Sequence, residues 1–471
     1  MMQKLPHTKI IATIGPSSWN EEVLKEMIEN GMQMARINAS FADFAELERV
    51  STLLRKLSSR VTIMLDTKGH KIRVTGFEHE RELKEGERII LIPETSAIST
   101  DNTIQITYPN LHKFVNKNTK ILIDDGNLIL NVVDTKAKEV HCVVKAGGIL
   151  KTRKTVNVPG VHLDFPDLSQ KDIDDIKYAV EHNFDYISAS FIRDRNDVEA
   201  VKTVMGKTDT KLIAKIEDGE GVSNIDEIIP LVDGIMIARG DMGVELPLEE
   251  VPIKQKIIIQ KCRIAGKLVI VATQMLESMK ESPRPTRAEV SDVANAVMDG
   301  TDAMMLSAET STGKYPIDAV RVMATVAKES EKVLKSQPIS GRTSASEETD
   351  VLCKTVVALI EELNLKGIIV ISQSGTTVRS LTRHRLKVPI WNISNNPKLI
   401  RQMDIYRGVT GIYIKQFNTD RDTMASKAAE VVYSQGLLAI DDKIAIICGS
   451  SIKRKNLNSI LEIAQVKDLL E

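Results

Sequence analysis

The sequence predicts an α/β protein: a (β/α)8 TIM barrel with an inserted small β-barrel lid domain and a C-terminal α/β domain. Three observations support this fold class. Eight short apolar stretches in the first 310 residues each end at a polar residue that could take part in chemistry. Residues 69–166 lack a long helical pattern and alternate between apolar and polar positions instead. Helix–strand alternation then resumes, and it starts once more after a polar linker at residues 336–350.

The eight stretches are rich in Val, Ile, Leu and Met, as buried parallel strands are. They cover residues 9–15, 34–38, 62–68, 186–191, 211–217, 234–241, 268–274 and 303–309. In a (β/α)8 barrel the C-terminal ends of the strands meet on one face, where such enzymes place their active sites. We therefore expect one mouth to contain Arg36, Asp66, Lys68, Lys215, Glu217, Asp241, Thr273, Ser307 and Glu309.

The domain boundaries follow from these changes of pattern. We expect the barrel to take residues 1–68 and 167–335, the lid residues 69–166 and the last domain residues 345–471. The lid is inserted after the third barrel strand, so it could close over the mouth. Turn signals divide it into short strands, and the clearest of them is Asp125-Gly126-Asn127.

Within the barrel, Ser17 or Ser18 can cap the first helix and Gly31 can end it. The last domain begins with a helical pattern. Its apolar strands are predicted at residues 366–372, 389–394, 411–415 and 443–449.

Composition excludes several classes of function. The chain has 471 residues, with 63 Lys plus Arg against 64 Asp plus Glu, so nothing points to nucleic acid or an acidic membrane surface. No run approaches the ~20 apolar residues of a membrane span, and the N-terminus does not resemble a signal peptide. The four cysteines lie far apart without metal spacing, which favours buried free thiols and a cytoplasmic protein.

The region around Lys215 is the best candidate for chemistry. Lys215 and Glu217 lie two apart on a strand, so their side chains project to the same side, and Asp241 ends the next strand. Two such carboxylates suit a hard cation such as Mg²⁺, and the lysine offers positive charge to an oxyanion or phosphoryl group. Gly240 and Gly243 could expose amides to an anion. A buried salt bridge and an ordinary tight turn remain the alternatives.

A series of stretches occurs in order along the first two-thirds of the chain: TKIIATIGPSS, MARINAS, LDTKG, VNVPGV, AKIEDGEGV, DGIMIARGDMGVELP, ATQMLESM, PRPTRAEVSDVANAVMDGTDAMMLSAET and GKYP. Chance matches of this length and order are implausible. Together these stretches resemble the pyruvate kinase family, and the C-terminal domain resembles it more loosely. The family's three-domain plan is the one that the sequence pattern predicts.

The resemblance implies a role for each matching residue. Glu217 and Asp241 would bind the divalent cation, Mg²⁺ or Mn²⁺. Lys215 would contact the phosphoryl group in transfer and stabilise the enolate oxygen left behind. The amides of Gly240 and Asp241, with Thr273, would receive the carboxylate of phosphoenolpyruvate.

The resemblance also implies a nucleotide site for ADP. Arg36 would bridge the phosphates of substrate and nucleotide, with Asn38 nearby, and Arg73 would support the nucleotide phosphates. Lys154, with Asn157 and Pro159 beside it, would lie on the lid and reach the nucleotide when the lid closes. Ser307 and Glu309 would belong to the network that delivers a proton to the enolate carbon.

The sequence departs from the family pattern near the nucleotide. Where the family usually has N-F-S-H-G, this chain has N-A-S-F-A, so Phe41 stands in the place of a histidine. His70 is also unusual, because it replaces a proline beside the next departure, at Lys71.

Lys71 bears on the monovalent cation. Most members have glutamate there and need K⁺, at a site that would correspond to Asn38, Ser40, Asp66 and Thr67. Members with lysine do not need K⁺, and an ammonium group beside Asp66 can take the electrostatic role of the ion. We therefore predict that K⁺ is not required. A lysine that points into solvent near the lid hinge is the alternative.

Two further expectations concern regulation and assembly. The stretch 372–380 resembles the loop that holds a sugar-phosphate effector in regulated members, so a phosphorylated effector could bind near Ser372–Thr377. An ordinary strand-to-helix turn would use the same residues. The three cations in residues 449–455 could bind an anion or form a solvated charge run. Family members are usually homotetramers, and Arg287 lies in a segment that resembles a subunit contact.

Three functions stay open at this point. The first is phosphoryl transfer between phosphoenolpyruvate and ADP, a step of glycolysis. The second is a metal-dependent, enolate-forming lyase of the same barrel type, which would have no use for Arg73 and Lys154. The third is a non-catalytic, metabolite-binding homologue, against which the intact set around Lys215 argues. A membrane or a nucleic acid is not an expected partner.

Overall fold

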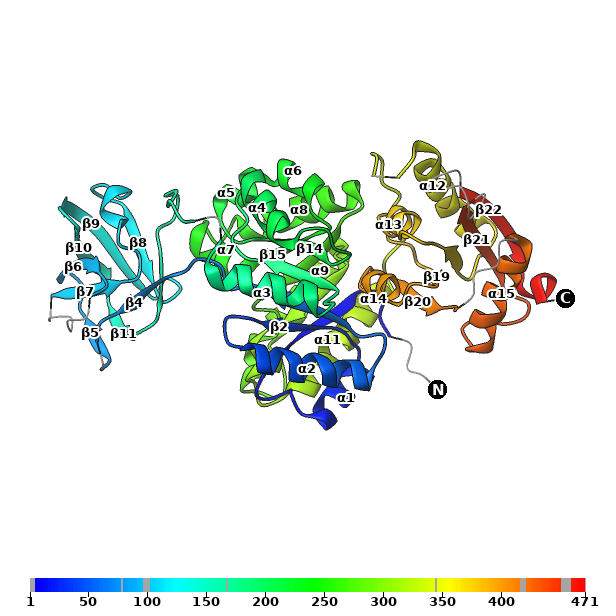
Figure 1. Ribbon diagram of the computed structural model, residues 1–471, viewed down its shortest axis with the longest axis horizontal. Coiled ribbons are helices and arrows are strands. Elements are labelled where there is room, and N and C mark those ends of the chain that lie inside the picture. The colour runs from blue at the N-terminus through cyan, green and yellow to red at the C-terminus, as the bar shows by residue number, and fades with distance from the viewer. Residues whose placement is uncertain are drawn as a thin grey trace.

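The computed structural model describes residues 5–77, 79–95, 102–166, 168–343, 345–415, 421–449 and 459–470. Within these residues the chain forms three parts in a row, with the lid at one end of the central barrel and the C-terminal domain at the other (Figure 1). The predicted fold class is therefore confirmed.

Eight parallel strands close the central barrel in the order β1-β2-β3-β13-β14-β15-β16-β17, with β17 paired back to β1. Their bounds are β1 (Lys9–Ile14), β2 (Met32–Asn38), β3 (Thr62–Asp66), β13 (Tyr186–Ala189), β14 (Lys211–Ile216), β15 (Gly234–Ala238), β16 (Leu268–Ala272) and β17 (Ala303–Leu306). Each strand falls inside or overlaps one of the predicted apolar stretches. The polar residue predicted to end a stretch usually lies at or just after the end of its strand.

Helices surround the barrel between its strands. They are α1 (Glu21–Glu29), α2 (Phe44–Leu57), α3 (Gln170–Glu181), α4 (Arg195–Met205), α5 (Gly219–Ser223), α6 (Ile225–Ile228), α7 (Arg239–Glu245), α8 (Val251–Ala265), α9 (Arg287–Asp299), α10 (Ala308–Ser311) and α11 (Pro316–Glu331), with 3₁₀ turns η2 (Ile229–Leu231) and η3 (Glu277–Lys280).

One predicted helix cap was wrong. The side chain of Asn20 caps α1 by accepting the N–H of Val23, whereas Ser18 is buried and its hydroxyl accepts the N–H of Gly15. The chain therefore makes a tight turn after β1 before the helix begins.

Alternate residues of the barrel strands face two different cores. Ile11, Met34, Met64 and Met236 lie inside the barrel, where flexible methionines fit irregular space, and belong to a buried cluster that continues into the C-terminal domain. Their neighbours along the strands, such as Ile10, pack against the surrounding helices. The barrel interior is therefore filled, and ligands can reach only its ends.

The lid is a second closed barrel, with strand order β10-β6-β7-β4-β12-β8-β9 and its own apolar core. Its strands are β4 (Ile72–Thr75), β6 (Arg88–Pro93), β7 (Thr103–Ile106), β8 (Lys120–Ile123), β9 (Leu128–Lys136), β10 (Glu139–Ala146) and β12 (Thr155–Asn157), with the pair β5 (Arg81–Leu83) and β11 (Gly148–Leu150) and the 3₁₀ turn η1 (Leu111–Lys113). The turn expected at residues 125–127 lies between β8 and β9, with Gly126 at φ 88°.

The C-terminal domain has a five-stranded sheet in the order β20-β19-β18-β21-β22. Its strands are β18 (Ile368–Ile371), β19 (Ile390–Ser394), β20 (Val409–Tyr413), β21 (Lys443–Gly449) and β22 (Ser459–Gln465), and its helices are α12 (Glu347–Glu362), α13 (Thr376–Thr382), α14 (Pro397–Asp404), α15 (Arg421–Ser434) and α16 (Val466–Leu470). The first four strands are parallel, whereas β22, which the sequence analysis does not predict, pairs antiparallel with β21.

Two further expectations concern cysteines and membranes. All four cysteines are buried and, among the described residues, none forms a disulfide, as predicted. Among the described residues no helix combines the length and the apolar character needed to span a bilayer.

Candidate active site

The mouth of the barrel brings together an arginine, a lysine and two carboxylates from three strand ends. Arg36 lies on β2, Asp66 ends β3, and Lys215 and Glu217 lie at and just beyond the end of β14. All four are buried, with at most 9% of each residue exposed. Their position follows from the parallel register, which sets Asn38 of β2 beside Asp66 of β3.

Lys215 is the centre of this group. Its Nζ lies 3.2 Å from Asp66 Oδ1 and 3.1 Å from Glu217 Oε1, and it donates to the hydroxyl of Ser190 at 2.8 Å. Burial alone would lower the pKa of Lys215, but Asp66 and Glu217 outweigh it and raise that pKa. The side chain is therefore a permanent ammonium at physiological pH.

Arg36 completes the positive charge around Asp66. Its Nε donates to Asp66 Oδ2 at 2.6 Å, and its Nη1 donates to the hydroxyl of Thr13 at 3.0 Å. Burial would raise the pKa of Asp66, but Arg36 and Lys215 outweigh it and lower that pKa. Asp66 therefore orients two cations toward the mouth.

Glu217 and Asp241 are the predicted metal ligands. Glu217 Oε2 accepts the N–H of Phe191 at 2.7 Å, while its Oε1 lies in an ion pair with Lys215 at 3.1 Å and accepts no well-aligned hydrogen bond among the described residues. Burial raises the pKa of Glu217. A buried carboxylate oxygen with capacity left to bind, near a second carboxylate, suits a hard divalent cation.

Asp241 has a partner that the sequence analysis places elsewhere. Lys71 Nζ donates to Asp241 Oδ1 at 2.6 Å and lies 5.3 Å from the centre of the Phe191 ring. We expected its ammonium group beside Asp66. The oxygens of Asp66 already face Arg36 and Lys215, and the segment after β3 carries Lys71 over Phe191 to the Asp241 side. Burial would raise the pKa of Asp241, but Lys71 and Lys215 outweigh it and lower that pKa.

The other residues expected at the monovalent-cation site make local contacts. Asn38 Oδ1 accepts the N–H of Ser40 at 3.0 Å, and Thr67 Oγ1 accepts the N–H of Ser190 at 3.1 Å. Phe41, in the turn after β2, is 85% exposed.

The start of α7 packs tightly against the end of β16. The N–H of Gly240 donates to Thr273 Oγ1 at 2.7 Å, and a Cβ at Gly240 would lie 3.2 Å from that oxygen. Thr273 and Gln274 have φ of 70° and 53°, which is unusual for residues with side chains. Such strain is concentrated at functional sites.

Ser307 and Glu309 lie together at the end of β17. Glu309 accepts the backbone N–H groups of Ser307 at 2.7 Å and of Leu276 at 3.1 Å, and burial raises its pKa. The hydroxyl of Ser307 is buried without a hydrogen-bond partner among the described residues. Glu309 therefore holds two loops together, and Ser307 has the free hydroxyl.

The lid residues predicted to reach the nucleotide bind elsewhere in this structure. Arg73 donates to the carbonyl of Arg153 at 2.7 Å, and Lys154 Nζ lies 2.6 Å from Asp124 Oδ1, all within the lid. Asn157 donates to Glu245 of α7 at 2.7 Å. Lys68 is exposed, and its backbone N–H bonds to Asp172.

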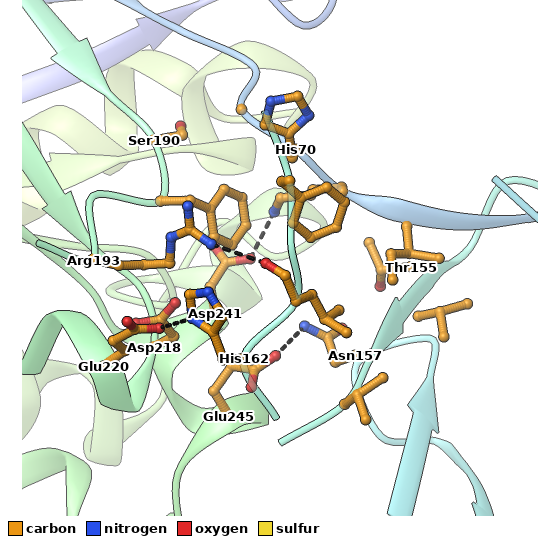
Figure 2. Close-up of a pocket in the computed structure, with 18 of the residues that line it drawn as sticks. His70, Thr155, Asn157, His162, Ser190, Arg193, Asp218, Glu220, Asp241 and Glu245 are labelled. Carbon is orange, nitrogen blue, oxygen red and sulfur yellow. Dashed lines mark hydrogen bonds and ion pairs between the residues drawn. The ribbon is translucent and has the colours of Figure 1, made fainter. Parts of the chain in front are cut away.

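A pocket separates the lid from the barrel on the side of β13 to β15 (Figure 2). Its walls include Lys71, Asp241, His162 and Glu220. His70 stacks on Phe165 with ring centres 5.2 Å apart, and burial lowers its pKa. His70 is thus a wall of the pocket.

Ser190 and Thr13 were missed as site residues. Ser190 bridges Lys215 and the carbonyl of Thr67, and Thr13 orients Arg36. Both fall near the C-terminal ends of predicted barrel strands, so the position in the barrel was the signal that could have identified them.

The proposed effector loop forms an ordinary turn in this structure. Ser372 Oγ accepts the N–H of Gly375 at 2.8 Å, and Gly375 has φ 73°. Of the basic segment at residues 449–455, all but Gly449 lies outside the described residues.

Comparison with known proteins agrees with this architecture. The family description "Pyruvate kinase, barrel domain" matches residues 5–320, and "Pyruvate kinase, alpha/beta domain" matches residues 350–464. The chain is 40% identical to a pyruvate kinase of Geobacillus stearothermophilus, over 98% of the chain and 81% of that protein. It is 37% identical to one of Clostridium acetobutylicum, over 99% of the chain and 100% of that protein. The chain therefore belongs to the pyruvate kinase family of phosphotransferases.

Proposed function

We propose that this protein moves a phosphoryl group from phosphoenolpyruvate to ADP, giving pyruvate and ATP. The observation that supports this most strongly is the buried ammonium of Lys215, held between Asp66 and Glu217 at 3.2 and 3.1 Å. Such a group can meet a phosphoryl oxygen on one side and a developing enolate on the other. Phosphoryl transfer needs mainly positioning and neutralisation of charge, which this arrangement can supply.

Glu217 and Asp241 are the side chains that would hold a divalent cation, Mg²⁺ or Mn²⁺. When bound, such a cation supplies further positive charge to the phosphate oxygens. Lys215 would stabilise the enolate oxygen as the bond to phosphorus breaks. Arg36, oriented by Asp66 and Thr13, would bind the transferring group and the acceptor phosphates.

The end of β16 and the start of α7 would receive the substrate carboxylate. Thr273 Oγ1 accepts the N–H of Gly240, and the two residues lie so close that a side chain at position 240 would crowd Thr273. The surface therefore needs a glycine at position 240. Ser307 would belong to the path that brings a proton to the enolate carbon, since its hydroxyl is buried and free to donate among the described residues.

We further propose that the enzyme does not require K⁺. The ammonium group of Lys71 lies 2.6 Å from Asp241, the carboxylate predicted to share the metal with Glu217. A carboxylate at position 71 would change the local charge by two units and would attract a cation instead.

The lid would keep water from the reacting phosphoryl group. Water can replace ADP as acceptor, so a closed lid commits the phosphoryl group to the nucleotide. Arg73 and Lys154 would turn from their present partners in the lid toward the nucleotide phosphates on closure.

The test is a turnover assay with phosphoenolpyruvate, ADP and Mg²⁺, in which pyruvate and ATP are measured together. We expect equal amounts of both products. Lys215→Met should lower kcat by a factor on the order of 10²–10³, because one charge contact to the transition state is lost.

A lyase would consume a 2-oxo acid without any dependence on ADP, and a binding homologue would give no turnover. Either result would overturn the proposal. Circular dichroism of the Lys215→Met protein checks that the variant is folded.

A further inference from the structure

The lid is joined to the barrel by two chain segments, which run out after β3 and back before α3. A domain held in this way can swing, so other contacts must decide where it lies. Side chains make several contacts across the gap, among them His162 with Glu220 and Asn157 with Glu245, which Figure 2 shows. Lys71 also binds Asp241, and Arg193 donates to the carbonyl of Leu163 at 3.2 Å.

The contact between Asn157 and Glu245 differs from the others. Lys71, His162 and Leu163 lie in the connecting segments, whereas Asn157 lies on β12, which is paired to both β4 and β8 of the lid barrel. Asn157 therefore moves together with the strands of the lid barrel. The amide Nδ2 donates to Glu245 Oε1 at 2.7 Å.

Glu245 is the last residue of α7, the helix that begins at the substrate side of the mouth. Gly240 and Asp241 lie in its first turn, so this single helix connects the lid contact to the proposed substrate and metal ligands. The contact of Asn157 with Glu245 therefore links the lid to the same helix that contains Gly240 and Asp241.

The surroundings of the Glu245 carboxylate favour its hydrogen bond with Asn157. This carboxylate is half-buried and lies in the field of Asp218 and Asp241, both of the same sign. A carboxylate in such a place is costly when it loses a hydrogen bond, and Asn157 donates one. The pair of His162 and Glu220 is weaker, because 63% of the histidine side chain is exposed.

We propose that Glu245 is a positioning residue that tethers the lid through Asn157, so that the lid closes from a fixed point and shields the phosphoryl group from water. This proposal rests on the proposed function. It concerns the balance between two acceptors, ADP and water. In the unwanted reaction a water oxygen bonds to phosphorus, the bond to the enol oxygen breaks, and the enolate takes a proton at carbon, giving pyruvate and inorganic phosphate.

The experiment measures pyruvate formed per ATP formed, together with the KM for ADP, for the full-length protein. Glu245→Ala should raise the share of pyruvate that appears without ATP, and the KM for ADP, each by about tenfold, which is the scale of a lost hydrogen bond to a charged group. Glu245→Gln keeps an oxygen that can accept from Asn157, so it should restore most of the wild-type ratio.

Asn157→Ala and the double variant Asn157→Ala/Glu245→Ala distinguish a tether from two separate effects. For a tether the double variant should resemble the single variants, because one contact is removed in each case. Asn116→Asp, at an exposed lid position, is the matched control and should leave both quantities at the wild-type values. Circular dichroism excludes misfolding as the cause.

A wild-type enzyme that makes no pyruvate from phosphoenolpyruvate would defeat the proposed function itself. An active wild-type enzyme whose product ratio is unchanged in Glu245→Ala would defeat the tether alone. A lower KM for ADP in Glu245→Ala would also overturn it, because the contact would then hold the lid away from the nucleotide.

Discussion

At the scale of single residues, the mouth balances its charges before any ligand binds. Three cations, Arg36, Lys71 and Lys215, face three carboxylates, those of Asp66, Glu217 and Asp241. The strand-end pattern predicts five of these charges at the mouth, and Lys71 enters only through the resemblance to the family. The expected pairing of Lys71 with Asp66 is wrong, since Lys71 binds Asp241. The path of the segment after β3 decides this, and the sequence does not give that path.

Lys71 gives the prediction that belongs to this scale. The wild-type enzyme should turn over at the same rate, within about twofold, with and without K⁺, in a buffer free of other monovalent activators. Lys71→Glu should be poorly active without K⁺ and should gain about tenfold when K⁺ is added, because the new carboxylate attracts a cation. Steady-state kinetics in tetramethylammonium buffer measures both.

Lys71→Met is the neutral control. It should lose activity without gaining a response to K⁺, since it removes the ammonium group and adds no carboxylate. A tenfold activation of the wild-type enzyme by K⁺ would refute the role assigned to Lys71.

At the scale of elements, the ends of strands and the N-caps of helices fix the positions of the loops that contain functional side chains. The helix α9 illustrates this, because Thr286 and Glu289 form a capping box at its start. Glu289 also accepts the N–H and the hydroxyl of Ser278, so the cap ties α9 to the loop after β16. The loop that contains Thr273 and Gln274 is thus braced from one side.

Thr286→Ala should lower the free energy of unfolding by about 1 kcal/mol, the usual cost of a lost N-cap hydrogen bond. Thr355→Ala is the matched control, because Thr355 lies inside α12 and its hydroxyl bonds only to the exposed helix carbonyl of Val351. Urea unfolding followed by circular dichroism compares the two variants. Equal midpoints for both variants would show that the cap contributes nothing.

At the scale of the whole molecule, buried charges join the barrel to the C-terminal domain. Asp302, just before β17, accepts both Nη groups of Arg385 at 2.8 and 3.1 Å and the N–H of Arg407 at 3.2 Å. Tyr186 of β13 donates to the carbonyl of Gln402 on α14. These contacts lie at the end of the barrel away from the lid. They hold the C-terminal domain on the barrel and involve no active-site residue.

His384 gives the prediction for this scale. It is buried in the C-terminal domain, where its Nδ1 accepts the N–H of Ile339 in the linker, and burial lowers its pKa to about 4. The unfolded chain takes up the proton near the ordinary value of about 6.5, so it binds the proton first as the pH falls. The contribution of neutral His384 to the free energy of unfolding is therefore complete above pH ~6.5. It falls by about 3 kcal/mol as the pH drops to ~4.

Thermal unfolding between pH 7 and pH 4 measures this effect, with His384→Asn as the comparison. The advantage in apparent Tm of the wild type over the variant should fall as the pH drops through the stated window, because only the wild type loses stability by protonation of His384. A difference that is constant with pH would mean that His384 does not titrate as the structure indicates.

The sequence by itself determined the barrel and the lid, and it predicted that Arg36, Asp66, Lys215 and Glu217 lie together at the mouth. Long apolar runs that end in polar residues can be buried as parallel strands in few ways, and their ends then meet at one face. Only the tertiary structure decided the partner of Lys71, the use of Ser190 and Thr13 as supports, and the contact between Asn157 and Glu245. Each of these contacts joins segments far apart in the chain. Their partners and distances arise only when the barrel closes or when the lid is set against it, so a strand-end position can suggest such a residue but cannot give its partner.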